Sequence, residues 1–283
     1  MNKINFIGII SATNCNPNGD PLLENRPRTD YVGYGEITDV CIKRKIRNRL
    51  QLAGERILLQ AHDRIDDGCK NVKERASLPA VRKLLSQKQE TEAISVLCQE
   101  FFDVRAFGMV FTMLPFKNTM ISGVKGPVTI SMARSLDAVT IRDIQITRSG
   151  NITTEEGRGS ETYGMSLPKI DYGAYIFSGG ITPFIAQKTG FSDEDAEKLK
   201  VAMLDMFQTD AAIARPDGSM YVPLFYWIKH ESSLGVCNSA LINKAIKIAK
   251  KDDIDIPCRW EDYEVDDHEL FEIPKLTIEK YTL

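Results

Sequence analysis

The clearest hydrophobic pattern lies near the start of the chain. Residues 4–13 form an almost continuous apolar, β-branched run, which predicts a central strand buried on both faces. Beyond a loop rich in Asn, Gly and Pro, apolar side chains recur at helical spacing at Ile42, Ile46, Leu50 and Ala53. Thr38 is placed to cap this segment and Gly54 to end it, so we predict an amphipathic helix between them.

The rest of the chain predicts alternating helices and strands. We expect helices within residues 78–102, 192–207 and 238–249, and strands near residues 108–114, 127–133, 141–147, 172–181 and 221–228. Ser192 and Asp195 suit a capping box, and Pro223 suits a position near a sheet edge. The order strand, helix, two strands, helix, strand is that of ferredoxin-like RNA-recognition domains. We therefore predict an α+β fold with large insertions.

Basic side chains are concentrated on the first predicted helix, where five of the seven residues from 43 to 49 are Lys or Arg. A helical projection places Lys43 and Arg47 on one side of the apolar stripe. It places Lys45 and Arg49 on the other side, with Arg44 pointing outward. This arrangement favours a helix that packs through one face and binds anions with the rest. A charged helix face is also typical of simple solvation, and this segment alone does not decide between the two.

Charge is separated along the chain. Residues 26–56 carry eight bases and four acids, whereas residues 251–283 carry four bases and eleven acids, in a chain of net charge −3. This separation suits nucleic-acid binding at the basic end, head-to-tail contact between copies of the chain, or both. We interpret the acidic end as a solvated or partner-facing extended tail.

Composition is that of an ordinary globular protein, with 43% hydrophobic and 27% charged residues among 283. No apolar run approaches the roughly 18 residues of a membrane span, and the first residues lack a signal-peptide layout. We therefore expect a cytoplasmic protein with no membrane contact. The six cysteines are scattered and the three histidines lie far apart, which predicts free thiols, no metal site and no cofactor.

Motifs that would indicate catalysis are weak. Neither a phosphate-binding Gly-x-x-x-x-Gly-Lys-Ser/Thr loop nor a Gly-x-Gly-x-x-Gly turn is present, so nucleotide hydrolysis is disfavoured. Residues 105–112 faintly resemble the aromatic strand of RNA-recognition domains, and we interpret them as a buried strand with Phe107 and Phe111 in the core. Asp20 and Asp30 are candidate metal ligands for phosphodiester cleavage, but turn formation explains both carboxylates better.

Four motifs occur together in the first half of the chain, at residues 16–21 (Asn-Pro-Asn-Gly-Asp-Pro), 38–48, 103–108 and 126–135. In this order they resemble the repeating backbone subunit of type I-C CRISPR surveillance complexes, or Cascade, of the RAMP superfamily. The resemblance implies one domain, residues 1–283, shaped like a right hand with a modified RNA-recognition palm. Residues 55–104 would be helical fingers, and the hairpin at residues 149–170 would be a thumb whose RNA-contacting residues the sequence does not identify.

The resemblance also implies a function and a set of contacts. The chain would be a non-catalytic subunit that polymerises head to tail along CRISPR RNA (crRNA), meets other Cascade subunits and presents the guide for pairing with target DNA. The residues that would contact the RNA backbone are Asn16, Asn18, Lys43, Lys45, Arg47, Arg49, Arg105 and Lys125. The alternative is a related metal-dependent RAMP endoribonuclease that cleaves target RNA near Asp20 or Asp30. A third alternative is an oligomerising protein that does not contact nucleic acid.

Overall fold

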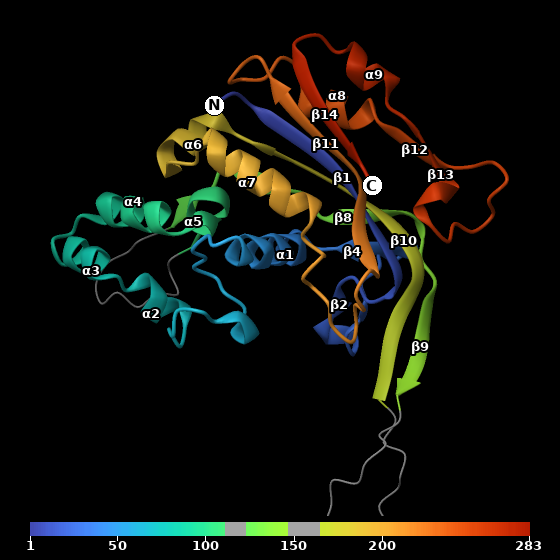
Figure 1. Cartoon of the computed structure of the whole chain (residues 1–283), viewed down its shortest axis with the longest axis horizontal. Coiled ribbons are helices and arrows are strands. Elements are labelled where there is room, and N and C mark those ends of the chain that lie inside the picture. The colour runs from blue at the N-terminus through green and yellow to red at the C-terminus, as the bar shows by residue number, and fades with distance from the viewer. Residues whose placement is uncertain (111–122, 147–164) are drawn as a thin grey trace, which may run out of the picture.

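A computed structural model describes residues 1–110, 123–146 and 165–283. Its centre is an eight-stranded antiparallel sheet in the order β14, β11, β1, β10, β8 and β4, with β7 and β9 also paired to β10 (Figure 1). These strands are β1 (Ile4–Cys15), β4 (Tyr34–Ile37), β7 (Val128–Ile130), β8 (Ala133–Ala138), β9 (Ile141–Ile146), β10 (Met165–Ile181), β11 (Met220–His230) and β14 (Leu276–Thr282).

Helices and three small strand pairs surround this sheet. The α-helices are α1 (Asp39–Leu52), α2 (Val72–Ala76), α3 (Pro79–Ser86), α4 (Glu90–Glu100), α5 (Phe102–Phe107), α6 (Pro183–Thr189), α7 (Asp193–Leu204), α8 (Ser239–Lys244) and α9 (His268–Glu272). The small pairs are β2 (Gly19–Asp20) with β3 (Arg26–Pro27), β5 (Gly108–Met109) with β6 (Val124–Lys125), and β12 (Lys247–Lys250) with β13 (Tyr263–Asp266). Within the described residues, no helix is both long and apolar enough to cross a membrane.

The prediction that the first strand is buried on both faces is confirmed. Phe6 and Ile10 of β1 point into a core shared with α1 and α7, whereas Ile7 and Ile9 point into a second core shared with α8, β13 and α9. Because side chains alternate along a strand, a strand with layers on both faces has apolar residues at nearly every position. Figure 1 shows α1 and α7 on one side of the sheet and α8, α9, β12 and β13 on the other.

The first predicted helix forms as α1, with one difference in its apolar stripe. The Thr38 hydroxyl accepts a hydrogen bond from the Cys41 amide at 3.2 Å, which confirms the N-cap. Ile42, Ile46 and Leu50 are buried as predicted. Ala53 lies after the last helical turn and is exposed, so its assignment to the stripe is wrong.

The second long helix of the sheet face, α7, also begins where the sequence indicates. Ser192 and Asp195 form the predicted capping box: the Ser192 hydroxyl accepts from the Asp195 amide and the Asp195 carboxylate accepts from the Ser192 amide. Leu199 and Met203 are buried in the core shared with α1. The helix ends at Leu204 rather than at Phe207, and an irregular segment follows it.

The region after α1 forms a helical unit with its own core. The expected helices within residues 78–102 are confirmed as α3 and α4. Their buried side chains pack with residues from α2, α5 and the preceding loop, namely Leu58, Ala76, Val81, Leu85, Ala93, Leu97, Cys98, Phe101 and Val104. In Figure 1 this unit extends to one side of the sheet.

Strands β9 and β10 form a hairpin that projects from the body of the molecule (Figure 1). Strand β10 begins at Met165, so residues 165–170 of the predicted thumb pair with β9. Residues 147–164, which hold the rest of the predicted thumb at 149–170, lie outside the described residues.

The acidic C-terminal region is folded, which corrects the prediction of an extended tail. The helix expected at 238–249 ends at Lys244, and residues 247–250 instead pair with β13. Strand β14 then adds to the sheet beside β11. The sequence did not indicate this folding because the apolar side chains that anchor the region, such as Tyr263 and Leu270, are separated from one another by acidic residues.

Three further predictions need correction. Residues 105–107, interpreted as the start of a buried strand, are helical in α5; the strand expected at 108–114 does begin at Gly108, as β5, and residues 111–122 lie outside the described part of the chain. Met132 does not continue the buried alternation of Val128 and Ile130, because it is 46% exposed. Pro223 lies at a bulge between β1 and β11, where the register shifts and a missing amide costs no ladder bond.

The edge strand β14 is held to the body by Glu279. Its carboxylate contacts the ammonium groups of Lys200 on α7 at 2.6 Å and Lys229 on β11 at 3.2 Å. Burial alone would raise the pKa of Glu279, but hydrogen bonds from Lys200, Tyr281 and Lys229 outweigh it and lower the pKa to about 2.

Replacing Glu279 with Gln is expected to lower the free energy of unfolding at neutral pH by about 1 kcal/mol, a figure discounted for partial exposure. The folded-state pKa lies below the ordinary value of 4.5, so this stabilisation is complete above that value and is lost as the pH falls toward 2. Urea unfolding of both proteins at about pH 7 and about pH 3 measures the difference. A difference that does not shrink at the lower pH would contradict this role.

Candidate nucleic-acid interface

The loop before α1 is ordered by its own asparagines. The Asn18 Oδ1 atom accepts from the Thr38 amide at 2.9 Å and from its hydroxyl at 3.0 Å, which ties the loop to the start of α1. Asn16 is only 1% exposed, and its Nδ2 donates to the Asn25 carbonyl at 2.7 Å. Both predicted RNA contacts therefore face the protein, where they shape the loop.

One flank of α1 is covered by carboxylates from the segment between α7 and β11. Lys45 is 5% exposed and forms an ion pair with Asp210, while Arg49 donates to Asp205 at 2.7 Å. Burial lowers the pKa of Lys45, and the adjacent Asp210 opposes that shift. The prediction that this flank presents free cations is wrong for the chain in this conformation.

The other flank of α1 divides into a buried and an accessible cation. Arg47 is 7% exposed and its Nε donates to Asp103 at 2.9 Å, so this predicted RNA contact is neutralised within the chain. Lys43 is half-buried and pairs at 3.0 Å with Asp39, one turn earlier and 40% exposed. An ion pair of this kind contributes about 0–1 kcal/mol and exchanges readily with another anion. Arg44 is not the outward cation expected, because it is half-buried and donates to the Leu59 carbonyl.

Of the other two predicted cations, Arg105 is ion-paired and Lys125 is exposed. Arg105 donates to Asp195 at 2.8 Å and lies 3.6 Å from Glu55, which makes it a link between α5 and α7. Lys125 is exposed on β6 and forms no ion pair within the residues that the structure describes. Of the eight predicted contacts, Lys125 is the exposed one. The side chains of Lys43 and Arg49 are similarly exposed, at 21% and 24%, but the carboxylate paired with Lys43 is the more accessible, at 40% against 19%.

The Phe107 ring lies beside Lys43, and its backbone leads into the strand that pairs with Lys125. The Lys43 ammonium lies 5.9 Å from the centre of the Phe107 ring, and the Arg47 guanidinium lies 5.0 Å from it. Phe107 ends α5, and the next residue, Gly108, pairs with Lys125. Phe107 was predicted to lie in a buried strand; it instead ends a helix and lies beside two cations, which no local pattern in the sequence indicated.

Close backbone packing fixes this geometry. A Cβ added to Gly126 would lie 2.3 Å from the Phe107 carbonyl carbon and 2.4 Å from the Gly108 nitrogen. Gly108 itself has φ +74°, which favours glycine. Two glycines therefore allow β6 to lie against the end of α5 and place Lys125 beside Phe107.

Another accessible cation lies beside the start of α1. Arg134 of β8 is opposite Glu36 of β4, and its guanidinium lies 4.0 Å from the centre of the Tyr34 ring. Its side chain is 50% exposed and donates to Asp30 at 2.8 Å. Along β8, Arg134 shares its face with Leu136 of the second core, whereas Lys43 and Phe107 pack on the α1 side of the sheet. We call these two cation–aromatic clusters, Tyr34 with Arg134 and Phe107 with Lys43 and Lys125, the α1 rim. Cations interleaved with aromatic rings can bind phosphates and stack on unpaired bases.

The candidate metal ligands have structural roles. Asp20 accepts from the Leu22 amide and pairs with Arg28, whereas Asp30 accepts from the Val32 and Tyr34 amides. Desolvation alone would raise the pKa of Asp30, but the hydrogen bonds from Arg134 and from these amides together outweigh it and lower the pKa. Over the described ranges, no cluster of three or more His, Cys, Asp or Glu side chains could hold a metal ion.

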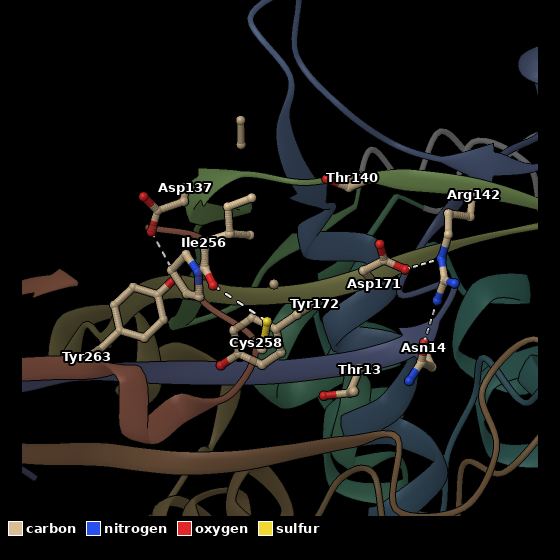
Figure 2. Close-up of a pocket in the computed structure, with 13 residues that line it drawn as sticks. Thr13, Asn14, Asp137, Thr140, Arg142, Asp171, Tyr172, Ile256, Cys258 and Tyr263 are labelled. Atoms are coloured by element: carbon tan, nitrogen blue, oxygen red, sulfur yellow. Dashed lines mark hydrogen bonds and ion pairs between the residues drawn. The ribbon is translucent and has the colours of Figure 1, made fainter. Parts of the chain in front are cut away.

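A cavity of about 340 Å³ lies at the base of the β9–β10 hairpin (Figure 2). Its charged groups are largely paired: Arg142 bridges Asn14 and Asp171, and the Tyr263 hydroxyl donates to Asp137 at 2.8 Å. Two carboxylates and one guanidinium do not favour an anion. This cavity is therefore a poorer phosphate site than the α1 rim.

Comparison with known proteins assigns the fold and the family. A model of the family described as CRISPR-associated protein Cas7 matches residues 2–267, so the chain belongs to the Cas7 family. A CRISPR-associated protein Cas7 from Haloferax volcanii is 28% identical over 217 residues, which cover 70% of this chain and 62% of that protein. The chain thus spans less than two thirds of that relative.

A solved structure supports the fold. One chain of a CRISPR RNA-guided surveillance complex, pre-nicking, has a TM-score of 0.52 and 15% sequence identity to this protein, with 86% of each chain covered. The shared architecture is a mixed helical and antiparallel-sheet fold. At this identity the similarity supports the fold and carries no residue-level assignment.

Proposed function

We propose that this chain is a non-catalytic backbone subunit that holds CRISPR RNA in a Cascade-type surveillance complex. The observation that carries the proposal is the Cas7 family match over residues 2–267. The α1 rim supports it. Lys43 of α1 lies beside the Phe107 ring, and Arg134 of β8 lies beside the Tyr34 ring, so the rim pairs cations with aromatic rings. The four motifs of the first half favour type I-C.

The core is proposed to be a modified ferredoxin-like palm. In sequence order the core strands are β1, then β7 and β8, then β10, then β11. Across the sheet the order is β11, β1, β10, and then β7 and β8, which is 4-1-3-2 in sequence ranks. Helices α1 and α7 follow the first and third strands and share one core. This is the connectivity of the ferredoxin-like fold. Residues 55–104 and 149–170 are then insertions into a single domain, as fingers and thumb.

The proposed binding mechanism is sequence-independent. Lys43, Lys125 and Arg134 would neutralise phosphates and release counterions, leaving base edges free for pairing with target DNA. Each copy supplies few contacts, so contiguous copies arranged head to tail along one RNA would supply the affinity. Other Cascade subunits would occupy the ends of that assembly. Carboxylates paired with Lys43 and Arg134 are replaced by phosphates in this scheme.

The test is RNA binding by Lys43→Ala and Lys125→Ala. Each is expected to weaken binding of single-stranded RNA of any sequence about threefold to tenfold and to reduce the salt slope by about 0.7. Fluorescence anisotropy between about 50 and 200 mM salt measures both quantities. The matched control is Lys247→Ala, which removes an exposed, ion-paired lysine from the opposite layer.

Two outcomes would contradict the proposal. If the salt dependence of RNA affinity were the same for Lys43→Ala, Lys125→Ala and Lys247→Ala, the α1 rim would not be part of the RNA interface. Magnesium-dependent RNA cleavage by the assembled complex that is lost in Asp20→Ala or Asp30→Ala would instead support the endoribonuclease alternative.

A further inference from the structure

The irregular segment between α7 and β11, residues 205–219, lies over the Lys45 and Arg49 flank of α1. Asp205 pairs with Arg49 at 2.7 Å, and Asp210 pairs with both Lys45 and Arg215, the latter at 2.9 Å. The Arg215 guanidinium also donates to the Asn16 carbonyl at 3.4 Å. Three cations from two segments are therefore grouped around two carboxylates beside the first family motif.

We call this segment the 205–219 cover. Met206 anchors its start in the main core, with Phe207 packed beside it, whereas residues 208–218 are held by ion pairs and hydrogen bonds. No side chain from residues 208 to 218 is buried, and Ile213 is 80% exposed. The remaining contacts are polar: the Asn16 amide donates to the Ala214 carbonyl at 2.8 Å, and Arg64 donates to the Thr209 carbonyl at 2.7 Å. A segment with few apolar contacts opens at low cost relative to the core.

We propose that Lys45 and Arg49 form a second phosphate-binding site, which the Asp210 and Asp205 carboxylates occupy in the RNA-free chain. Phosphates of the bound strand replace these carboxylates as the cover moves away from α1. The inference rests on the proposed RNA-binding function and adds its regulation: a lone chain binds RNA weakly, and the site opens on a strand already held at the α1 rim.

The exchange is physically reasonable because each cation keeps an anionic partner. Removing the partner of a buried cation is costly, whereas replacing a carboxylate with a phosphate leaves the charge compensated. A strand held at the α1 rim also raises the local phosphate concentration near the cover. The carboxylates of the cover thus compete with phosphate for the α1 cations. An RNA strand already bound at the α1 rim displaces them more readily than an unbound RNA strand does.

The test uses Asp210→Asn and Asp205→Asn in the full chain, with Asp217→Asn as the matched control. Asp217 is an exposed carboxylate of the same segment that forms no ion pair within the described residues. Single-stranded RNA is expected to bind Asp210→Asn and Asp205→Asn about threefold to tenfold more tightly than the wild type. Their salt slopes should be steeper by about 0.7 for each freed cation. The Asp217→Asn control is expected to match the wild type within about twofold.

A folding readout separates competition from loss of structure. Asp210→Asn leaves Lys45 without its partner, so its melting temperature should fall, and RNA should raise it more than it raises that of the wild type. In the wild type, amide hydrogen exchange of residues 208–218 should speed up when RNA binds. Slower or unchanged exchange, or equal RNA affinity of Asp210→Asn and Asp217→Asn, would overturn the inference.

The two proposals fail differently. If the wild type binds RNA and Lys43→Ala weakens it, but neither cover variant gains affinity, only the second site is wrong. If no variant binds RNA at any salt concentration, the proposed function is wrong and the cover is a structural latch.

Discussion

Replacing Asp103 with Asn is expected to lower the free energy of unfolding by about 3 kcal/mol. Asp103 is 1% exposed; its carboxylate accepts from Arg47 at 2.9 Å and from the amides of Leu58 and Leu59 at 2.8 and 3.1 Å. Asparagine would leave the buried Arg47 guanidinium without a negative partner. Its amide NH2 group would also face N–H donors that now bind the carboxylate. Urea unfolding at neutral pH measures the change.

The consequences of this substitution extend to the interface. Asp103 joins α1, α5 and the segment that begins the helical unit, so it fixes the position of Phe107 against Lys43. The control is Asp63→Asn, an 80% exposed carboxylate of the same region, which should change stability by less than about 0.5 kcal/mol. Comparable stabilities for the two variants would show that the buried carboxylate is dispensable.

Replacing Gly126 with Ala is expected to cost about 2–3 kcal/mol and to weaken RNA binding as Lys125→Ala does. The new methyl group would lie 2.4 Å from the Ala106 carbonyl oxygen, and backbone cannot move aside as a flexible side chain can. Strand β6 must therefore shift, which moves Lys125 away from Phe107. Thermal unfolding and RNA anisotropy on the same sample measure the two effects.

A matched substitution separates packing from the general cost of losing a glycine. Gly190 has φ +77° with nothing within 4 Å of an added Cβ, so Gly190→Ala should cost only the left-handed penalty of about 1–2 kcal/mol. It should leave the salt slope unchanged. If Gly126→Ala binds RNA as tightly as the wild type, Lys125 is not positioned by this contact.

Much of the fold follows from local patterns. The continuous apolar run of β1, the Thr38 cap and the Ser192–Asp195 capping box each depend on residues close together in sequence, and all three are confirmed. Errors arose where neighbours are distant in sequence. Residues 102–107 are helical although aromatic-rich, and the acidic end is folded because single apolar residues reach a second core.

The candidate site was predicted less fully than the fold. The two flanks of α1 follow from helical geometry, Lys125 is exposed, and Lys43 is half-buried beside Asp39; their contact with RNA stays a prediction. The positions of Phe107 and Arg134 in the α1 rim depended on strand pairing that the sequence did not indicate. Turn signals did, however, correctly indicate structural roles for Asp20 and Asp30.

By itself the sequence determined the secondary structure around the basic helix, its cap, its apolar stripe and the family motifs, because these depend on spacing within a few turns. Only the tertiary structure decided which cations a polyanion can reach. The carboxylate that neutralises Arg47 lies 56 residues away and the one that neutralises Arg49 lies 156 residues away. Ion pairing is a short-range contact in space between residues of unrelated sequence position, so no count of charges along the chain reveals it.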